Sequence, residues 1–254
     1  MTSQWIEEVA GACRTAGIDY LDVIIDQAGL DRSVIPALTV LALEWQSLYQ
    51  GLPEEFIVDA APLITRVNLD DAQQMQWLQA LSQQVPLLGI CSSWGFSALS
   101  AWLAQCTDIL QEGRGGIFRF YDTRIFPLLF THVLSEEQQQ CLLRPALFWA
   151  WQDKDGLPRG MEGVGMPALR GEISRKIELS DRQLEYLCCV SDVIIMLAHH
   201  APPAGAYTSR QALFYDCYQG MVEATNNGII LDDAREEWVM NQLLGVARSP
   251  PDDA

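Results

Sequence analysis

The sequence YLDVIID at residues 20–26 is a short, mostly apolar run, and it predicts a buried strand. The residues before it have the pattern of an amphipathic helix. Apolar side chains recur on one helical face at Trp5, Ile6, Val9 and Cys13. Gly17 follows at a position where helices commonly end. The chain is therefore expected to begin as a helix that leads into a strand.

Helix and strand patterns keep alternating through the first 153 residues. Further strands are expected at 56–67, 86–93, 116–122 and 146–153. Helices are expected at 35–49, from Asp70 or Asp71 onward, at 97–110 and at 123–143. Pro62 interrupts the second strand, which indicates an edge position or a bulge. The alternation predicts an α/β domain at residues 1–153, with a layered mixed or parallel sheet of about five strands and flanking helices.

The pattern changes beyond this domain. Residues 154–176 are rich in glycine and proline and are expected to form a linker or an irregular hairpin. Residues 177–248 have purely helical periodicity, which predicts a small all-helical C-terminal lobe. Ser180 and Gln183 have the spacing of a capping box at the start of its first helix. The tail at 249–254 is expected to be disordered.

The net charge of −17, from 33 acidic and 16 basic residues, is the strongest feature of the composition. Such a surface repels phosphate backbones, so nucleic-acid binding is not expected. A basic partner would be favoured by this charge. A general contribution of acidic residues to solubility explains the charge equally well.

The cysteines and the N-terminus indicate where the protein resides. Seven cysteines without C-x-x-C spacing indicate free thiols in a reducing cytoplasm. The N-terminal sequence MTSQWIEEVAG has acidic residues where a signal peptide carries positive charge. Residues 72–107 carry no charge, but glutamines and Pro86 interrupt any apolar run long enough to span a bilayer. We therefore expect a cytoplasmic protein without membrane insertion.

The best candidate for a catalytic group is Cys91 in GICSS, residues 89–93, because its place between a strand and a helix is similar to the nucleophile elbow of α/β-hydrolases. A cysteine hydrolase of this type also needs a histidine base, for which the sequence offers His132, His199 and His200. Ser93, however, stands where the elbow requires glycine. The alternative is that Cys91 fills the end of a buried strand and that Ser92 or Ser93 caps the next helix. We favour this alternative and expect no catalytic residue.

Other short motifs do not complete a cofactor or metal site. GRGG at 113–116 precedes a strand, whereas a phosphate-binding loop follows a strand and opens a helix. DKDG at 153–156 resembles the start of a calcium loop, but Val164 stands where the loop needs its final glutamate. His199 and His200 point to different faces of a helix, which does not suit a zinc site. We expect no metal and no cofactor.

The stretch FRFYDTR at residues 118–124 gathers arginine and aromatic residues. Period-two alternation would place Phe118 and Phe120 on one face of a strand. Arg119 and Tyr121 would then lie on the other face. An arginine on a sheet face needs a partner, because a buried unpaired guanidinium is very costly.

Asp122 is expected at the switch from this strand to a helix. Its carboxylate can cap a helix that begins near Thr123. Arg124 in the first helical turn is unfavourable for the helix dipole, which indicates another partner. The two arginines either contact a partner protein or form structural ion pairs, for instance with Asp22, Asp26 or Asp59.

The same stretch resembles the arginine-aromatic-aromatic-aspartate-proline-arginine signature of the type VI secretion effector adaptors, also called effector chaperones. The residues that carry the resemblance are Arg119, Tyr121, Asp122 and Arg124. Thr123 stands where the family commonly has proline, a first helical position that threonine can also occupy.

The resemblance extends over about residues 18–153 and, more loosely, beyond them. Further similarities are YLDVIID followed by Gln27-Ala28, AAPLI at 60–64, and ATNNGI at 224–229. Members of this family are not enzymes and use no cofactor. The resemblance implies a cytoplasmic adaptor that binds a secreted toxin effector, encoded beside it, and helps to load the toxin onto the spike protein of the secretion apparatus.

Overall fold

The chain divides into two compact units, Met1–Leu179 and Ser180–Ala254. The computed structural model describes residues 4–169, 171–200, 207 and 209–248. The tail that was predicted to be disordered, 249–254, lies outside the described residues.

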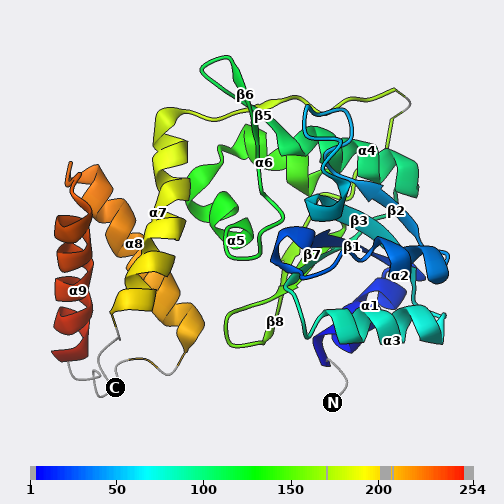
Figure 1. The fold of residues 1–254 in the computed structure, drawn as a ribbon, viewed down its shortest axis with the longest axis horizontal. Helices are drawn as coiled ribbons and strands as arrows, with labels where there is room; N and C mark the ends of the chain where they lie inside the picture. Colours follow the sequence, from blue (N-terminus) through cyan, green and yellow to red (C-terminus); the bar gives the residue numbers. More distant parts are fainter. Residues whose placement is uncertain (1–3, 170, 201–206, 208, 249–254) are drawn as a thin grey trace. The chain divides into compact units, whose positions relative to one another are not determined.

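Within its described residues, the first unit is built around a six-stranded sheet with the strand order β2-β3-β1-β4-β7-β8 (Figure 1). Every pair of neighbouring strands in this sheet is antiparallel. The strands are β1 Tyr20–Asp26, β2 Glu44–Ser47, β3 Pro62–Asn68, β4 Leu87–Cys91, β7 Phe148–Gln152 and β8 Pro158–Glu162. The predicted first strand is confirmed with the same bounds.

The prediction of a mixed or parallel main sheet is wrong, and the connection through α3 (Ala72–Leu81) shows why. β3 and β4 both run antiparallel to β1, so they are parallel to each other, and α3 links them as a helix links strands in a parallel sheet. β1 lies between them in the sheet. Alternation of helices and strands along the chain does not reveal such an intervening strand.

A second, three-stranded sheet has the order β6-β5-β9, in which β5 and β6 form an antiparallel hairpin and β9 pairs with β5 in parallel. Its strands are β5 Asp108–Gln111, β6 Arg114–Ile117 and β9 Ile177–Glu178. Glu112 and Gly113 have φ angles of 47° and 78°, so they make a two-residue hairpin turn. The GRGG motif therefore supplies half of a turn and the start of a strand.

One face of the main sheet is covered by α1 (Gln4–Thr15), α2 (Ile35–Val40) and α3, whose apolar side chains pack against alternate residues of β1, among them Val23 and Ile25. The predicted helical face of α1 is confirmed, since Trp5, Ile6, Val9 and Cys13 are all buried. Of the two candidate caps, Asp71 caps α3, accepting hydrogen bonds from the backbone of Gln73 and Gln74.

The other face carries α4 (Phe96–Thr107) and the segment that was predicted to be one helix at 123–143. That segment is broken: Leu134 is extended, with φ −86° and ψ 139°, and Ser135 caps a new helix. Pro127 lies in the first short piece, where its missing N–H is tolerated. The pieces are α5 Phe126–Leu128, a π-helical turn Leu129–Val133 and α6 Glu136–Leu143.

Residues 154–176, predicted to be a linker or an irregular hairpin, lie within the first unit. β8 extends the main sheet, and the Gly163 N–H bonds to Leu147 O at 2.9 Å. A Cβ atom at Gly163 would lie 2.0 Å from Ala146 O, so only glycine fits this close backbone approach. Tertiary contacts thus hold the segment against β7.

The second unit consists, in its described part, of helices, as the sequence predicts. The predicted start at residue 177 is wrong, because Ile177 and Glu178 form β9 within the first unit. The capping box of Ser180 and Gln183 is present at the start of the first of them. The helices are α7 Asp181–His199, α8 Arg210–Asn226 and α9 Asp232–Arg248. Among the described residues of the chain, none of the helices has the length and apolar character needed to cross a membrane.

Candidate functional site

The predicted strand at 116–122 ends early, at Ile117. The Phe118 N–H makes the last cross-strand hydrogen bond, with Thr107 O at 2.8 Å, and turns follow. The strand ends here because its neighbour β5 has reached its own first residue. Phe118 and Phe120 are buried and Arg119 is exposed, as the expected alternation requires, but the alternation is wrong for Tyr121, which is also buried.

The aromatic side chains of this turn all enter the core. Phe120 is fully buried, and its ring centroid lies 6.4 Å from that of Trp149 and 5.7 Å from that of Tyr121. Phe118 is buried beside it. The Tyr121 hydroxyl lies 3.4 Å from the Tyr49 hydroxyl, and burial raises the pKa of Tyr121. Tyr121 is thus a core residue.

Arg119 turns outward and pairs with Asp26, at the end of β1. The Arg119 Nη2 to Asp26 Oδ2 distance is 2.6 Å, and 47% of the Arg119 side chain stays exposed. Asp26 also accepts a hydrogen bond from the Ala28 N–H. Of the three aspartates considered from the sequence, Asp26 is the partner, whereas Asp22 pairs with Arg66. The ion pair connects the turn to the C-terminal end of β1.

Asp122 and Arg124 form a compact local pair. One carboxylate oxygen of Asp122 accepts from the Arg124 N–H at 3.0 Å, and the other from Arg124 Nη2 at 2.6 Å. The helix begins only at Phe126, so Asp122 stabilises the turn before the helix, and its predicted role as the cap itself is wrong. Burial acts to raise the pKa of the Asp122 carboxyl, but its hydrogen bonds and ion pair with Arg124 bring it below the usual value.

We expect Asp122→Ala to lower the free energy of unfolding by about 0.5–2 kcal/mol, because the Arg124 N–H loses its acceptor. Since the folded pKa of Asp122 is lowered, this contribution is present above about pH 4 and is lost as the pH falls through the folded pKa. Urea denaturation at several pH values measures it.

Arg119→Ala should lower the free energy of unfolding by less than about 1 kcal/mol, because the Arg119 side chain in its pair with Asp26 is half exposed.

The exposed Asp31 supplies a matched control for these variants, and Asp31→Ala should leave stability unchanged. An Asp122→Ala variant as stable as Asp31→Ala would show that the carboxylate contributes nothing to the fold.

Cys91, the candidate nucleophile, is fully buried at the end of β4. A hydrogen bond with the Cys13 thiol lowers the pKa of Cys91 and raises that of Cys13. Gly95 precedes α4 as its N-cap residue, so the expectation that Ser92 or Ser93 caps this helix is wrong. Burial and the thiol partner favour the packing interpretation of Cys91.

Among the seven cysteines, only Cys188 is exposed. We expect a brief treatment of the native protein with iodoacetamide to modify Cys188 first, while Cys91 and Cys13 react only after unfolding. Peptide mass spectrometry measures both. Modification of Cys91 as fast as that of Cys188 would restore it as a candidate nucleophile.

The other candidate motifs have structural roles. Asp153 of DKDG accepts a hydrogen bond from the Leu157 N–H at 2.9 Å and pairs with Arg159 at 2.7 Å, as a hairpin turn requires. His200 Nε2 lies 2.9 Å from a Glu236 carboxylate oxygen. In the part of the chain that the structure describes, no group of three or more His, Cys, Asp or Glu residues could hold a metal ion.

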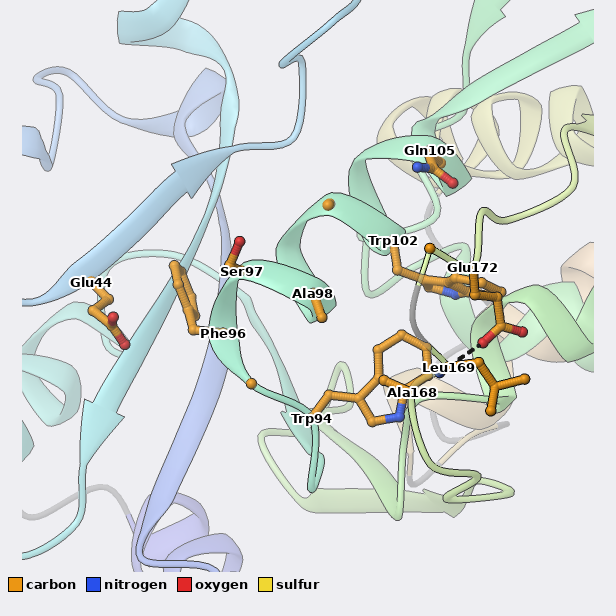
Figure 2. A pocket seen from close by; sticks show the side chains of 13 residues that line it. Glu44, Trp94, Phe96, Ser97, Ala98, Trp102, Gln105, Ala168, Leu169 and Glu172 are labelled. Atoms are coloured by element: carbon orange, nitrogen blue, oxygen red, sulfur yellow. Dashed lines mark hydrogen bonds between the residues drawn. The ribbon is translucent and has the colours of Figure 1, made fainter.

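A cavity of about 710 Å³ lies over α4 (Figure 2). Its floor includes the small residues Ala98 and Ala101. Trp94 and Trp102 line it and stand edge to face, with ring centroids 5.4 Å apart. Leu169, which is 64% exposed, comes from the segment after β8. The recess is open and largely apolar, and it suits a side chain or segment of another protein better than a small polar molecule.

The indole N–H groups of this cavity are already used. Trp94 Nε1 donates to Met166 O and Trp102 Nε1 donates to Cys141 O, both at 2.6 Å. The carboxylate of Glu172 at the rim pairs with Arg144 at 2.8 Å. The rings therefore offer contact surface and no free donor.

Sequence reasoning missed this cavity. In the helix expected at 97–110, Leu99, Trp102, Leu103 and Cys106 are buried, so this side packs against the core. The small residues on the opposite side were the available signal, but the wall formed by Leu169 lies far away in the chain.

Comparison with known proteins gives a family match. No curated protein and no solved structure matches the chain. Residues 23–141 match the family described as Domain of unknown function (DUF4123). This segment, which contains α4, the cavity floor and all of the 118–124 turn, is therefore similar to that family.

Proposed function

We propose that this protein is a cytoplasmic adaptor that binds a type VI secretion toxin effector and helps to load it onto the spike protein. The observation that carries the proposal is the motif of Arg119, Tyr121, Asp122 and Arg124, which lies inside the segment 23–141 that matches a protein family. The protein acts by binding, without catalysis and without a cofactor.

The geometry of the motif supports a division of labour within it. Tyr121 and Asp122 are buried and shape the turn. Arg119 and Arg124 keep 47% and 45% of their side chains exposed while paired with carboxylates. A guanidinium held in place by an ion pair keeps N–H groups for a partner's carboxylate or carbonyl groups. We assign partner contact to the two arginines and a supporting role to the other two residues.

The test is co-expression of a tagged chain with the toxin and the spike protein encoded beside it, followed by affinity capture and size-exclusion chromatography. We expect a complex that contains the toxin and stays intact on the column. Absence of a complex with every neighbouring toxin and spike protein would overturn the proposal.

Variants of the two arginines test whether they contact the toxin or only stabilise the fold. Arg119→Ala combined with Arg124→Ala should reduce toxin capture. Loss of Arg124 also leaves the buried Asp122 carboxylate without its ion-pair partner, so the melting temperature of the double variant should fall. Arg119→Ala alone should reduce capture with little change in melting temperature, because the Arg119 side chain is half exposed. Asp31→Ala is the matched control on the exposed surface. Unchanged capture by the double variant would return both arginines to a purely structural role.

The cavity over α4 is a second surface on which the toxin can rest. Ala101→Trp would fill it from the floor, and we expect toxin capture to fall. Ala12→Trp on the exposed side of α1 places the same bulk elsewhere and serves as the control. Equal capture by both variants would exclude the cavity from the binding surface.

A further inference from the structure

The β5–β6 hairpin leaves one strand at a sheet edge. Among the described residues, β6 has β5 as its neighbour on one side and ends the three-stranded sheet on the other. Figure 1 shows the hairpin projecting outward from the first unit. Arg114, Gly115 and Gly116 of β6 are exposed. An edge of this kind presents unpaired backbone groups that can pair with another chain.

The register identifies which backbone groups point outward. The two-residue turn makes Arg114 a hydrogen-bonded position of the hairpin. Hydrogen-bonded positions alternate along a hairpin, so Gly116 also bonds to β5. The next such position is Phe118, and its N–H does donate to Thr107 O, at 2.8 Å, which confirms the alternation. Gly115 and Ile117 occupy the positions between. Their N–H and C=O groups therefore point away from β5.

Little protects this edge. β8, at one edge of the main sheet, begins with Pro158 and carries Arg159 and Glu162, which are residues that discourage pairing. β6 has two adjacent glycines, and no atom lies within 4 Å of the position where a Cβ of Gly115 would be. A second backbone can thus approach it closely.

The side chains of the edge indicate what it would accept. The Arg114 side chain makes no ion pair with another described residue, in a chain whose net charge is −17. A Cβ at Gly116 would lie 3.6 Å from the side chain of Ile109, which is 6% exposed, so a large side chain that covers Gly116 would lie next to Ile109. Arg114 and Gly116 lie on the same face of the strand, because they are two residues apart.

We propose that β6 pairs, antiparallel, with an extended segment of the partner protein. The segment carries Asp or Glu opposite Arg114 and a large apolar residue opposite Gly116, two positions along on the same face. Directly opposite side chains of antiparallel strands lie about 4.5–5.5 Å apart, which suits an ion pair at the first position. At the second position a large side chain would cover Gly116, which has no side chain of its own, and extend toward Ile109 on β5 beyond it. The proposal rests on the proposed function, which supplies the toxin as the partner.

The experiment uses the full chain and the toxin encoded beside it. Gly115→Pro removes one outward N–H without removing a hairpin hydrogen bond, and the backbone there is outside the left-handed region, so the substitution is compatible with an edge strand. Gly115→Ala is the matched control, because it keeps the N–H. We expect Gly115→Pro to weaken toxin binding by about tenfold and Gly115→Ala to leave it within about twofold. Arg114→Glu should weaken binding, and Arg114→Lys should largely retain it.

Amide hydrogen exchange gives an independent readout. The Ile117 amide should exchange fast in the free chain and slowly in the complex, because it gains a cross-strand acceptor. Equal binding by Gly115→Pro and Gly115→Ala would overturn the edge pairing while the adaptor function stands. A wild-type chain that captures no toxin would overturn both. A dimer of the chain alone that Gly115→Pro dissociates would show that a second copy occupies the edge, and would also overturn the proposal.

Discussion

Arg66→Met is expected to lower the free energy of unfolding by about 3–5 kcal/mol at neutral pH, because it leaves a buried carboxylate without its partner. Asp22 on β1 has no exposed surface, and both of its oxygens accept from Arg66, at 2.8 and 2.7 Å. The same guanidinium donates to Trp94 O at 2.9 Å and lies 3.7 Å from the centroid of the Tyr20 ring. Urea denaturation measures the loss.

The pH dependence of this loss provides a second check. Burial raises the pKa of Asp22 to about 6, although Arg66 acts in the opposite direction. Because the pKa of Asp22 is higher in the folded than in the unfolded protein, the folded state binds the proton more tightly. The contribution of Asp22 protonation to stability is therefore greatest below about pH 4 and declines as the pH rises through about 6. In the Arg66→Met variant, the Asp22 carboxyl is protonated and uncharged at low pH, so no buried charge is left without a partner. The stability that Arg66→Met loses should therefore be smaller at about pH 4.5 than at about pH 7.5.

A double-mutant cycle supplies the control. Asp22→Asn combined with Arg66→Met removes the unpaired charge and should cost less than Arg66→Met alone. If the single and double variants lose the same stability, or if the loss of Arg66→Met does not change with pH, the buried charge is not its cause.

Phe120→Ala is expected to lower the free energy of unfolding by about 3–5 kcal/mol, because it opens a cavity in the core. Phe120 is fully buried, and its ring contacts the rings of Trp149 and Tyr121 at centroid distances of 6.4 and 5.7 Å. Thermal and urea denaturation measure the effect.

Phe56→Ala is a closely matched control, since Phe56 is 81% exposed on the loop before β3. It should change stability by no more than about 0.5 kcal/mol. A Phe120→Ala variant as stable as Phe56→Ala would mean that the turn at 118–124 does not anchor the core.

Local sequence signals predicted many of the element ends. Asp71 caps α3, and Ser180 and Gln183 form their capping box, because a cap needs only a side chain and the N–H groups within three residues of it. Gly17, where the first helix was expected to end, has a φ angle of 76°. Such contacts are local, so the sequence encodes them directly.

Elements that depend on a distant neighbour were not predicted. β2 lies within a predicted helix and is a strand because β3 pairs with it. Residues 154–176, predicted to be a linker or an irregular hairpin, contain β8, which forms a hairpin with β7. The opposite error occurred at 118–122, where a strand-like pattern has no partner and turns instead. Strand formation needs a second chain segment, and its position depends on the whole fold.

The candidate site shows the same division. The sequence identified Arg119, Tyr121, Asp122 and Arg124 as a motif and Cys91 as a residue that fills a strand end. It left the partner of Arg119 open among three aspartates, and only the end of β1 beside the turn selected Asp26. It placed Tyr121 beside Arg119 on one face, whereas the turn sends Tyr121 into the core.

By itself, the sequence determined the α/β and helical composition, the helix caps, the buried first strand and the motif that suggests an adaptor. Tertiary structure alone decided the antiparallel order of the main sheet, the pairing of Asp22 with Arg66, the recess over α4 and the open edge of β6. The physical reason is the separation along the chain of the residues that interact. Caps and periodicity arise from neighbours within one or two turns of the chain, whereas sheet order, buried ion pairs and surface recesses join residues that only folding brings together.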